Sequence, residues 1–130
     1  MGIIQHFQQL NAWQEAHTLV LQVYAVTKTF PSDEKFGLVS QMRRAAISIP
    51  ANIAEGFKRR GITEKIRFYN ISEGSLEELK YYFILGKDLG YLQNTDHLIH
   101  QAETVGRLLH GLISSTERRK TTPPSSPNPS

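Results

Sequence analysis

Cationic side chains are the most concentrated chemical feature of this sequence. Only two acids lie between positions 43 and 67, against seven bases, which are Arg43, Arg44, Lys58, Arg59, Arg60, Lys65 and Arg67. Clustered, mobile cations of this kind are suited to binding phosphate groups. The alternative is a solvated helix end, because Lys and Arg also complement the partial negative charge at a helix C-terminus. The sequence leaves these two interpretations equally open.

The rest of the chain balances this basic stretch. The 130 residues have a net charge of +3, from fifteen Lys and Arg against twelve Asp and Glu. Residues 1–117 hold twelve of each, so the excess comes from Arg118, Arg119 and Lys120. Residues 68–117 carry seven acids against three bases. The segregation of charge along the chain is therefore more informative than the net charge.

Side chains that could act as acids, bases or metal ligands are present, but their spacing indicates no catalytic site. The chain has no cysteine, which excludes a disulfide scaffold, a Cys-ligated metal and a thiol nucleophile. Three glutamates, Glu73, Glu77 and Glu78, lie at helical spacing. An acidic helix face that is solvated, or paired with cations across an interface, explains them better than acid–base catalysis does. One helical flank carries His97, His100 and Glu103, but without the Glu-x-x-His repeat of di-iron bundles. We expect no enzyme and no metal or other cofactor.

Four helices are expected to position these groups. Apolar residues recur at spacings of three and four, and the period-two alternation of a strand does not occur. The helices are expected at residues 7–29, 33–60, 63–89 and 94–117. Their short connections favour an all-α, antiparallel up-down four-helix bundle. Pro50 lies inside the second helix, where it cannot donate a backbone hydrogen bond, and this predicts a kink or a short break near residues 48–52.

Three of these helices carry an apolar stripe that identifies the core. In the first helix the stripe is Leu10, Trp13, Ala16, Val20, Val23, Tyr24 and Thr27. In the second it is Val39, Met42, Ala46, Ile49 and Ile53. In the fourth it is Leu98, Ala102, Val105, Leu109 and Leu112.

The bundle is expected to fill residues 7–117 as a single domain. Ser32 is a good N-cap followed by two acids, and Gly90 fits the left-handed position after a helix end. Residues 1–6 are expected to fray, and residues 118–130 to form a basic, then Pro- and Ser-rich, disordered tail. No apolar run is long enough to span a bilayer and no signal peptide is recognisable, so we expect a cytoplasmic protein.

Two stretches are more apolar than a lone bundle needs. Residues 45–54 (AAISIPANIA) carry no charge, although Ser48 and Ala51 lie opposite the core stripe. Residues 81–85 (YYFIL) cannot all face one core, which favours an exposed position for Tyr81 and Ile84. We expect these surfaces to form a homo-oligomer interface. The alternative is that a kink at Pro50 rotates both faces of the helix into one bundle.

Two blocks of the sequence resemble a known family. Residues 41–56 (QMRRAAISIPANIAEG) and 68–79 (FYNISEGSLEEL) are similar to the bacterial four-helix-bundle proteins called 23S rRNA intervening-sequence proteins. The resemblance extends over residues 10–113. It implies a helical bundle that assembles as a ring-like homopentamer, and it gives Asn52 and Glu55 a structural or interface role. It implies no catalytic residue.

Family members are encoded within intervening sequences of rRNA genes. They are similar to the accessory protein of diversity-generating retroelements, a basic pentameric bundle that acts with a reverse transcriptase and RNA. Two functional hypotheses follow. The first is a non-catalytic oligomer that binds nucleic acid, RNA rather than DNA being favoured, through its basic surface. The second is a scaffold that binds another protein, such as a reverse transcriptase, through the acidic and apolar flanks of the third helix.

Overall fold

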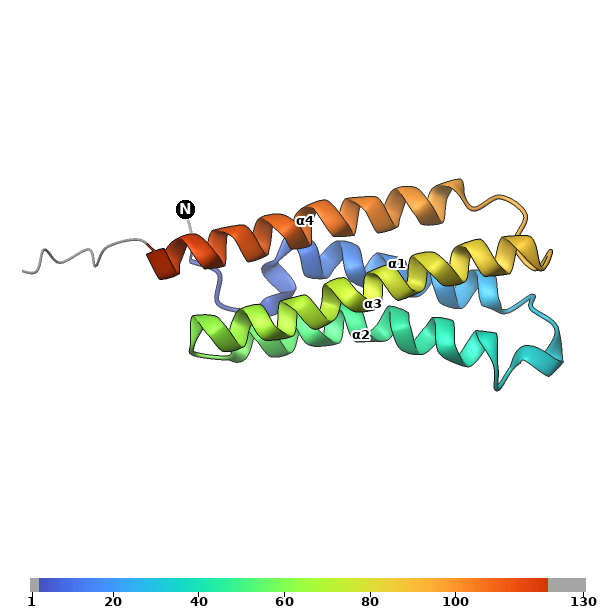
Figure 1. The fold of residues 1–130 in the computed structure, drawn as a ribbon, viewed down its shortest axis with the longest axis horizontal. Helices are drawn as coiled ribbons and strands as arrows, with labels where there is room; N and C mark the ends of the chain where they lie inside the picture. Colours follow the sequence, from blue (N-terminus) through green and yellow to red (C-terminus); the bar gives the residue numbers. More distant parts are fainter. Residues whose placement is uncertain (1–2, 122–130) are drawn as a thin grey trace, which may run out of the picture.

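The computed structural model describes residues 3–121, which form a bundle of four long helices (Figure 1). The helices are α1 (Asn11–Thr27), α2 (Leu38–Lys58), α3 (Ile62–Asp88) and α4 (Asp96–Thr121). Two 3-10 turns, η1 (Phe7–Gln9) and η2 (Ser32–Glu34), precede α1 and α2, and the described residues contain no strand. The expected all-α, four-helix fold is confirmed, and successive helices run in opposite directions along the bundle.

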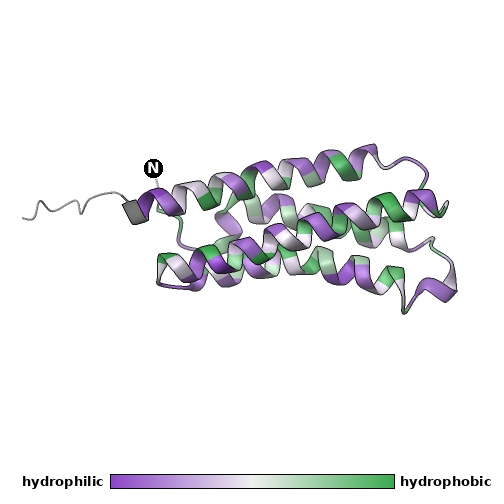
Figure 2. Ribbon diagram, viewed as in Figure 1, coloured by the Kyte–Doolittle hydropathy of each residue, from purple (hydrophilic) through white to green (hydrophobic). Residues whose placement is uncertain are grey.

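Each helix packs against two others. α1 and α3 each contact both α2 and α4, so the four helices enclose one core. Hydrophilic residues (purple) alternate with apolar residues (green) along the helices in Figure 2, as expected for helices that bury one side. Within the described range, no helix has the length and apolar character needed to cross a membrane.

The core stripe of α2 agrees with the sequence prediction at every position. All five stripe residues are buried, namely Val39, Met42, Ala46, Ile49 and Ile53. α2 is continuous through Pro50, so the short break that the sequence allowed does not occur. The kink itself stays a prediction. Ala45 and Pro50 are buried as well, which leaves Ile47 and Ala51 as the exposed residues of the uncharged stretch.

The buried stripes of α1 and α4 differ from the prediction by about one position. α1 buries Ala12 and Leu19, whereas Trp13 and Val20 are only half-buried. The Trp13 ring lies against the rings of Phe7 and His17, with both centroid distances at 5.2 Å, and so covers the edge of the core. In α4, Leu112 is half-buried and its neighbour Ile113 is buried in its place.

Small residues bring α2 and α3 close together. A Cβ atom on Gly56 would lie 2.6 Å from the Tyr69 ring, so only glycine fits at this crossing. Farther along, the Ser72 hydroxyl donates to the Ile49 carbonyl at 2.8 Å, and the Ser75 hydroxyl donates to that of Ser48 at 2.8 Å. Ser48 therefore faces α3 of its own chain rather than solvent.

The start of α2 differs from the prediction. Ser32 begins the 3-10 turn η2 instead of α2, and α2 begins six residues later at Leu38. The reason is the Glu34 carboxylate, whose Oε1 accepts the free N–H of Leu38 at 3.1 Å. A charged acceptor at this position also complements the helix dipole.

At the C-terminal end of α3 the prediction is confirmed, and at that of α4 it is wrong. Gly90 has φ +82°, and the Tyr91 and Leu92 N–H groups both donate to the Gly86 carbonyl, which closes the end of α3 as expected. α4 continues to Thr121 rather than ending at residue 117. Residues 118–121, predicted to be disordered, are therefore helical, and basic residues in a last turn favour this extension. The rest of the predicted tail, residues 122–130, lies outside the described residues.

Candidate nucleic-acid interface

Five of the seven predicted cations gather at one end of the bundle. Lys58 ends α2, Arg59 and Arg60 follow it in the α2–α3 turn, and Lys65 and Arg67 lie in the first two turns of α3. The last turns of α4 reach the same end (Figure 1), and Arg119 lines one cavity together with Lys65. We call this surface the basic end, which consists of Lys58, Arg59, Arg60, Lys65, Arg67, Arg118 and Arg119.

Arg43 and Arg44 lie elsewhere. Fifteen residues of helix separate Arg43 from Lys58, or about 22 Å at 1.5 Å per residue. The Arg43 Nε donates to the Thr27 hydroxyl at 3.0 Å, and its guanidinium lies 4.4 Å from the centre of the Tyr24 ring. Arg43 therefore links α2 to α1. Arg44 is exposed and donates a hydrogen bond to Gln41. The structure does not bring all seven predicted residues into one site.

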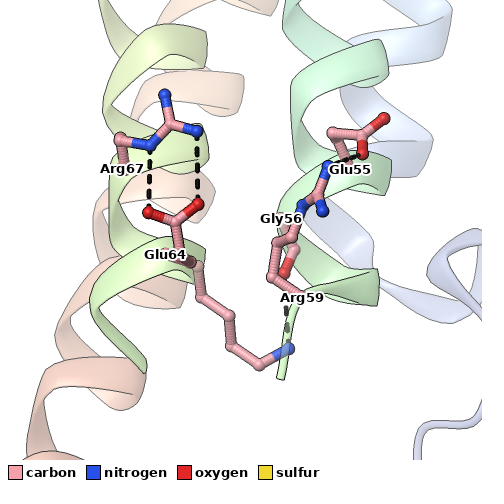
Figure 3. Close-up of polar contacts among 6 residues, drawn as sticks. Glu55, Gly56, Arg59, Glu64 and Arg67 are labelled. Atoms are coloured by element: carbon pink, nitrogen blue, oxygen red, sulfur yellow. Dashed lines mark hydrogen bonds and ion pairs between the residues drawn. The ribbon is translucent and has the colours of Figure 1, made fainter. Parts of the chain in front are cut away.

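Two of the cations at the basic end are paired with carboxylates (Figure 3). Arg67 makes two hydrogen bonds of 3.2 Å to Glu64, and Arg59 pairs with Glu55 one turn earlier in α2. Both guanidinium groups also lie over the half-buried Phe68 ring, at 4.5 Å for Arg67 and 4.9 Å for Arg59. These contacts hold the two arginines in place on either side of the α2–α3 turn.

Lys65 closes the C-terminal end of α2. Its Nζ donates to the Phe57 carbonyl at 2.7 Å and to the Gly56 carbonyl at 3.3 Å. Burial, with a smaller contribution from nearby Arg119, lowers the pKa of Lys65 below its usual value. At this one residue, the contacts fit the helix-end interpretation of the basic cluster.

Lys58 and Arg60 differ from their neighbours. Both side chains are exposed, and neither makes a hydrogen bond or an ion pair with any residue in the range 3–121. They are two cations of the basic end that are free to meet an external anion without breaking an internal contact.

Most of this structure matches a known protein family. Residues 8–111 match the family described as 23S rRNA-intervening sequence protein, a range that runs from η1 into α4 and includes the α2–α3 turn. The chain belongs to this family. No curated protein matches the chain significantly. The family match ends before Arg118 and Arg119, so these two residues of the basic end lie outside the matched segment.

A second surface, between α3 and α4, was partly indicated by the sequence. It is a groove of about 1040 Å³ whose walls carry three acids and two cations, with Leu76 as the apolar side chain of the lining. The acids are Glu73, Glu77 and Glu103, and the cations are Lys80 and Arg107. Glu78 lies outside this groove and accepts a 2.6 Å hydrogen bond from the Tyr82 hydroxyl. His97 and His100 are exposed, and no group of three metal-binding side chains occurs among the described residues.

The predicted interface residues are divided between two settings. Ala51, Tyr81 and Ile84 are exposed, and Ala51 and Ile47 line an apolar groove of about 310 Å³ between α1 and α2. In contrast, Ser48 and Asn52 are half-buried and bonded to each other, the Asn52 amide donating to the Ser48 hydroxyl at 3.0 Å. Glu55 is exposed but already forms an ion pair with Arg59. The exposed apolar members are the ones with surface left to contact a partner.

Proposed function

We propose that this family member is a non-catalytic, homo-oligomeric helical-bundle protein that binds nucleic acid, RNA in preference, through its basic end. The observation that supports the proposal is the gathering of seven cations from α2, the α2–α3 turn, α3 and α4 at one end, where Glu55, Glu64 and Glu117 are the acids. Lys58 and Arg60 can contact phosphates without breaking a hydrogen bond or an ion pair inside the protein. A cytoplasmic location is part of the same proposal, because RNA is found there.

The aromatic side chains of this surface favour binding to the nucleic-acid backbone over reading of bases. Phe68 already carries two guanidinium groups, and the Lys65 ammonium lies 5.5 Å from the centre of the Phe57 ring. Neither ring is an open platform on which a base could stack. We expect salt-sensitive binding with modest sequence preference.

Oligomerisation would strengthen such binding. The exposed apolar residues Ile47, Ala51, Tyr81 and Ile84 are available for contacts between copies, and the family resemblance favours five subunits. Each added subunit repeats the basic end, so several weak phosphate contacts would act together through avidity.

A gel-shift titration with structured RNA at about 50 and 200 mM salt tests the proposal. Lys58→Ala with Arg60→Ala should weaken binding and reduce the slope of log affinity against log salt, by about 1.4 if both residues contact single-stranded phosphates. The matched control is Lys28→Ala with Lys87→Ala, which removes two exposed cations remote from the basic end. No binding by the wild type at low salt, or equal loss in both double variants, would refute the proposal.

A second function is supported by the groove between α3 and α4. Its three carboxylates outnumber the two cations Lys80 and Arg107, and Lys80 already pairs with Glu77, so Glu73 and Glu103 are the acids left to receive a basic segment of another protein, such as a reverse transcriptase. This scaffold function predicts that Glu73→Lys with Glu77→Lys abolishes binding of the partner protein while RNA binding is unchanged. The nucleic-acid function predicts the reverse for the Lys58 and Arg60 variant.

A further inference from the structure

A cavity of about 330 Å³ lies at the basic end, between the N-terminal segment, the start of α3 and the last turns of α4. Its polar lining includes Lys65, Tyr69 and Arg119, and its apolar lining includes Ile4, Leu10 and Phe57. The volume is at the lower limit of small-molecule sites, which span about 300–1,000 Å³.

The charges around this cavity are of one sign. Lys65 and Arg119 both line it, and no Asp or Glu does. Two of the three N–H bonds of the Lys65 ammonium go to carbonyls of α2, which leaves one for a ligand. Arg119 lies close enough to lower the pKa of Lys65 by repulsion. Two like charges without a counter-ion are unfavourable, and a bound anion would remove this cost.

The Tyr69 hydroxyl is a neutral donor in the same place. The side chain is only 2% exposed, yet its hydroxyl makes no hydrogen bond with any described residue. The hydroxyl oxygen itself retains some accessible surface, so it can donate a hydrogen bond to a group in the cavity. Burial raises the pKa of Tyr69, which keeps the hydroxyl protonated and able to donate.

The apolar wall indicates what the anion is attached to. Ile4, Leu10 and Leu112 offer a surface for an apolar or aromatic group beside the two cations. A phosphate monoester matches the donors, because it carries close to two negative charges at neutral pH and accepts several hydrogen bonds.

We propose that this cavity binds a phosphate monoester carried on an aromatic group, as in a nucleoside monophosphate that is free or terminates an RNA strand. The RNA-end form rests on the proposed function, and the free form does not.

The first test is calorimetric titration of the full chain with AMP, and with adenosine as the ligand that lacks phosphate. AMP should bind and adenosine should bind at least about tenfold more weakly. Arg119→Gln and Tyr69→Phe should each weaken AMP binding by about tenfold and about threefold, respectively. The control Lys87→Gln removes one exposed cation remote from the basic end and should change AMP affinity by less than about twofold. No AMP binding, or equal loss in Lys87→Gln and Arg119→Gln, would overturn the proposal.

The second test uses one oligoribonucleotide with a phosphate at its 5′ end, at its 3′ end or at neither. A preference for one phosphorylated end that disappears in Arg119→Gln supports the RNA-end form. AMP binding without any end preference overturns that form and leaves the free nucleotide as the ligand. RNA binding without AMP binding or end preference overturns the cavity proposal but not the proposed function. AMP binding without RNA binding overturns the proposed function, and the RNA-end form with it, and leaves the free nucleotide as the ligand.

Discussion

The Tyr91 hydroxyl donates a 3.0 Å hydrogen bond to Glu34, and so joins the α3–α4 connection to the α1–α2 connection. The other oxygen of the same carboxylate caps α2 at Leu38. The Tyr91 ring also packs on Phe30, with a centroid distance of 5.3 Å. Tyr91, in the α3–α4 connection, therefore holds Glu34, whose carboxylate fixes where α2 begins.

Tyr91→Phe should lower the melting temperature, because it removes the hydroxyl and keeps the ring contact with Phe30. Thermal unfolding followed by circular dichroism measures the change. Tyr82→Phe is the matched control, since it removes a hydrogen bond to Glu78 within the same helix. An equal or smaller drop for Tyr91→Phe than for Tyr82→Phe would show that the link between the connections adds nothing to stability.

The same hydrogen bond predicts a dependence on pH. Glu34 accepts the bond and raises the pKa of Tyr91, so the folded state favours the protonated phenol. Its stabilisation is complete below the unfolded-state pKa of about 10 and is lost as the pH rises through the folded-state value. The difference in melting temperature between wild type and Tyr91→Phe should therefore be unchanged up to about pH 9 and shrink as the pH rises above about 10. A constant difference over this range would contradict the assignment.

Gly56→Ala should destabilise the bundle by about 1–3 kcal/mol, because the new methyl group would overlap the Tyr69 ring. Gly74→Ala should stabilise it by about 0.5–1 kcal/mol, since nothing lies within 4 Å of that position and alanine favours the helix. Urea unfolding of both variants provides the measurement. A stabilised Gly56→Ala variant would mean that α2 and α3 are farther apart than described.

Ala51→Glu should weaken self-association if the apolar groove beside Ile47 is the contact between copies, because the carboxylate would be buried without a partner. Light scattering at micromolar concentration gives the mass. Gln41→Glu, an exposed substitution on the same helix, should leave the mass unchanged. A monomeric wild type would rule out the oligomer itself.

Local patterns in the sequence identified the helices and most of the core, because they depend on spacing along one helix. The stripe from Val39 to Ile53 and the left-handed Gly90 are of this kind. The start of α2 was missed because Glu34 is held by Tyr91, a residue 57 positions away. No spacing rule reports such a contact.

The candidate site likewise combines contacts that local spacing predicts with contacts that it does not predict. The stretch from Lys58 to Arg67 was expected to gather at one end because a short turn joins its helices. In the sequence Arg119 falls in the predicted tail, and its position beside Lys65 depends on α4 extending past residue 117. Phe68, which lies under two guanidinium groups, carries no sequence signal that separates it from a core residue.

The order in which the helices contact one another bears on how the chain folds. Three of the four interfaces join helices that are consecutive in the chain, and only the pairing of α1 with α4 spans its whole length. Local topologies of this kind fold in about microseconds to milliseconds, because little loop-closure entropy opposes them. The Gln101 amide, which donates to the Glu15 carbonyl at 2.9 Å and to its carboxylate at 2.8 Å across 86 residues, belongs to that last interface. Truncating Gln101 should therefore speed unfolding while leaving the folding rate nearly unchanged.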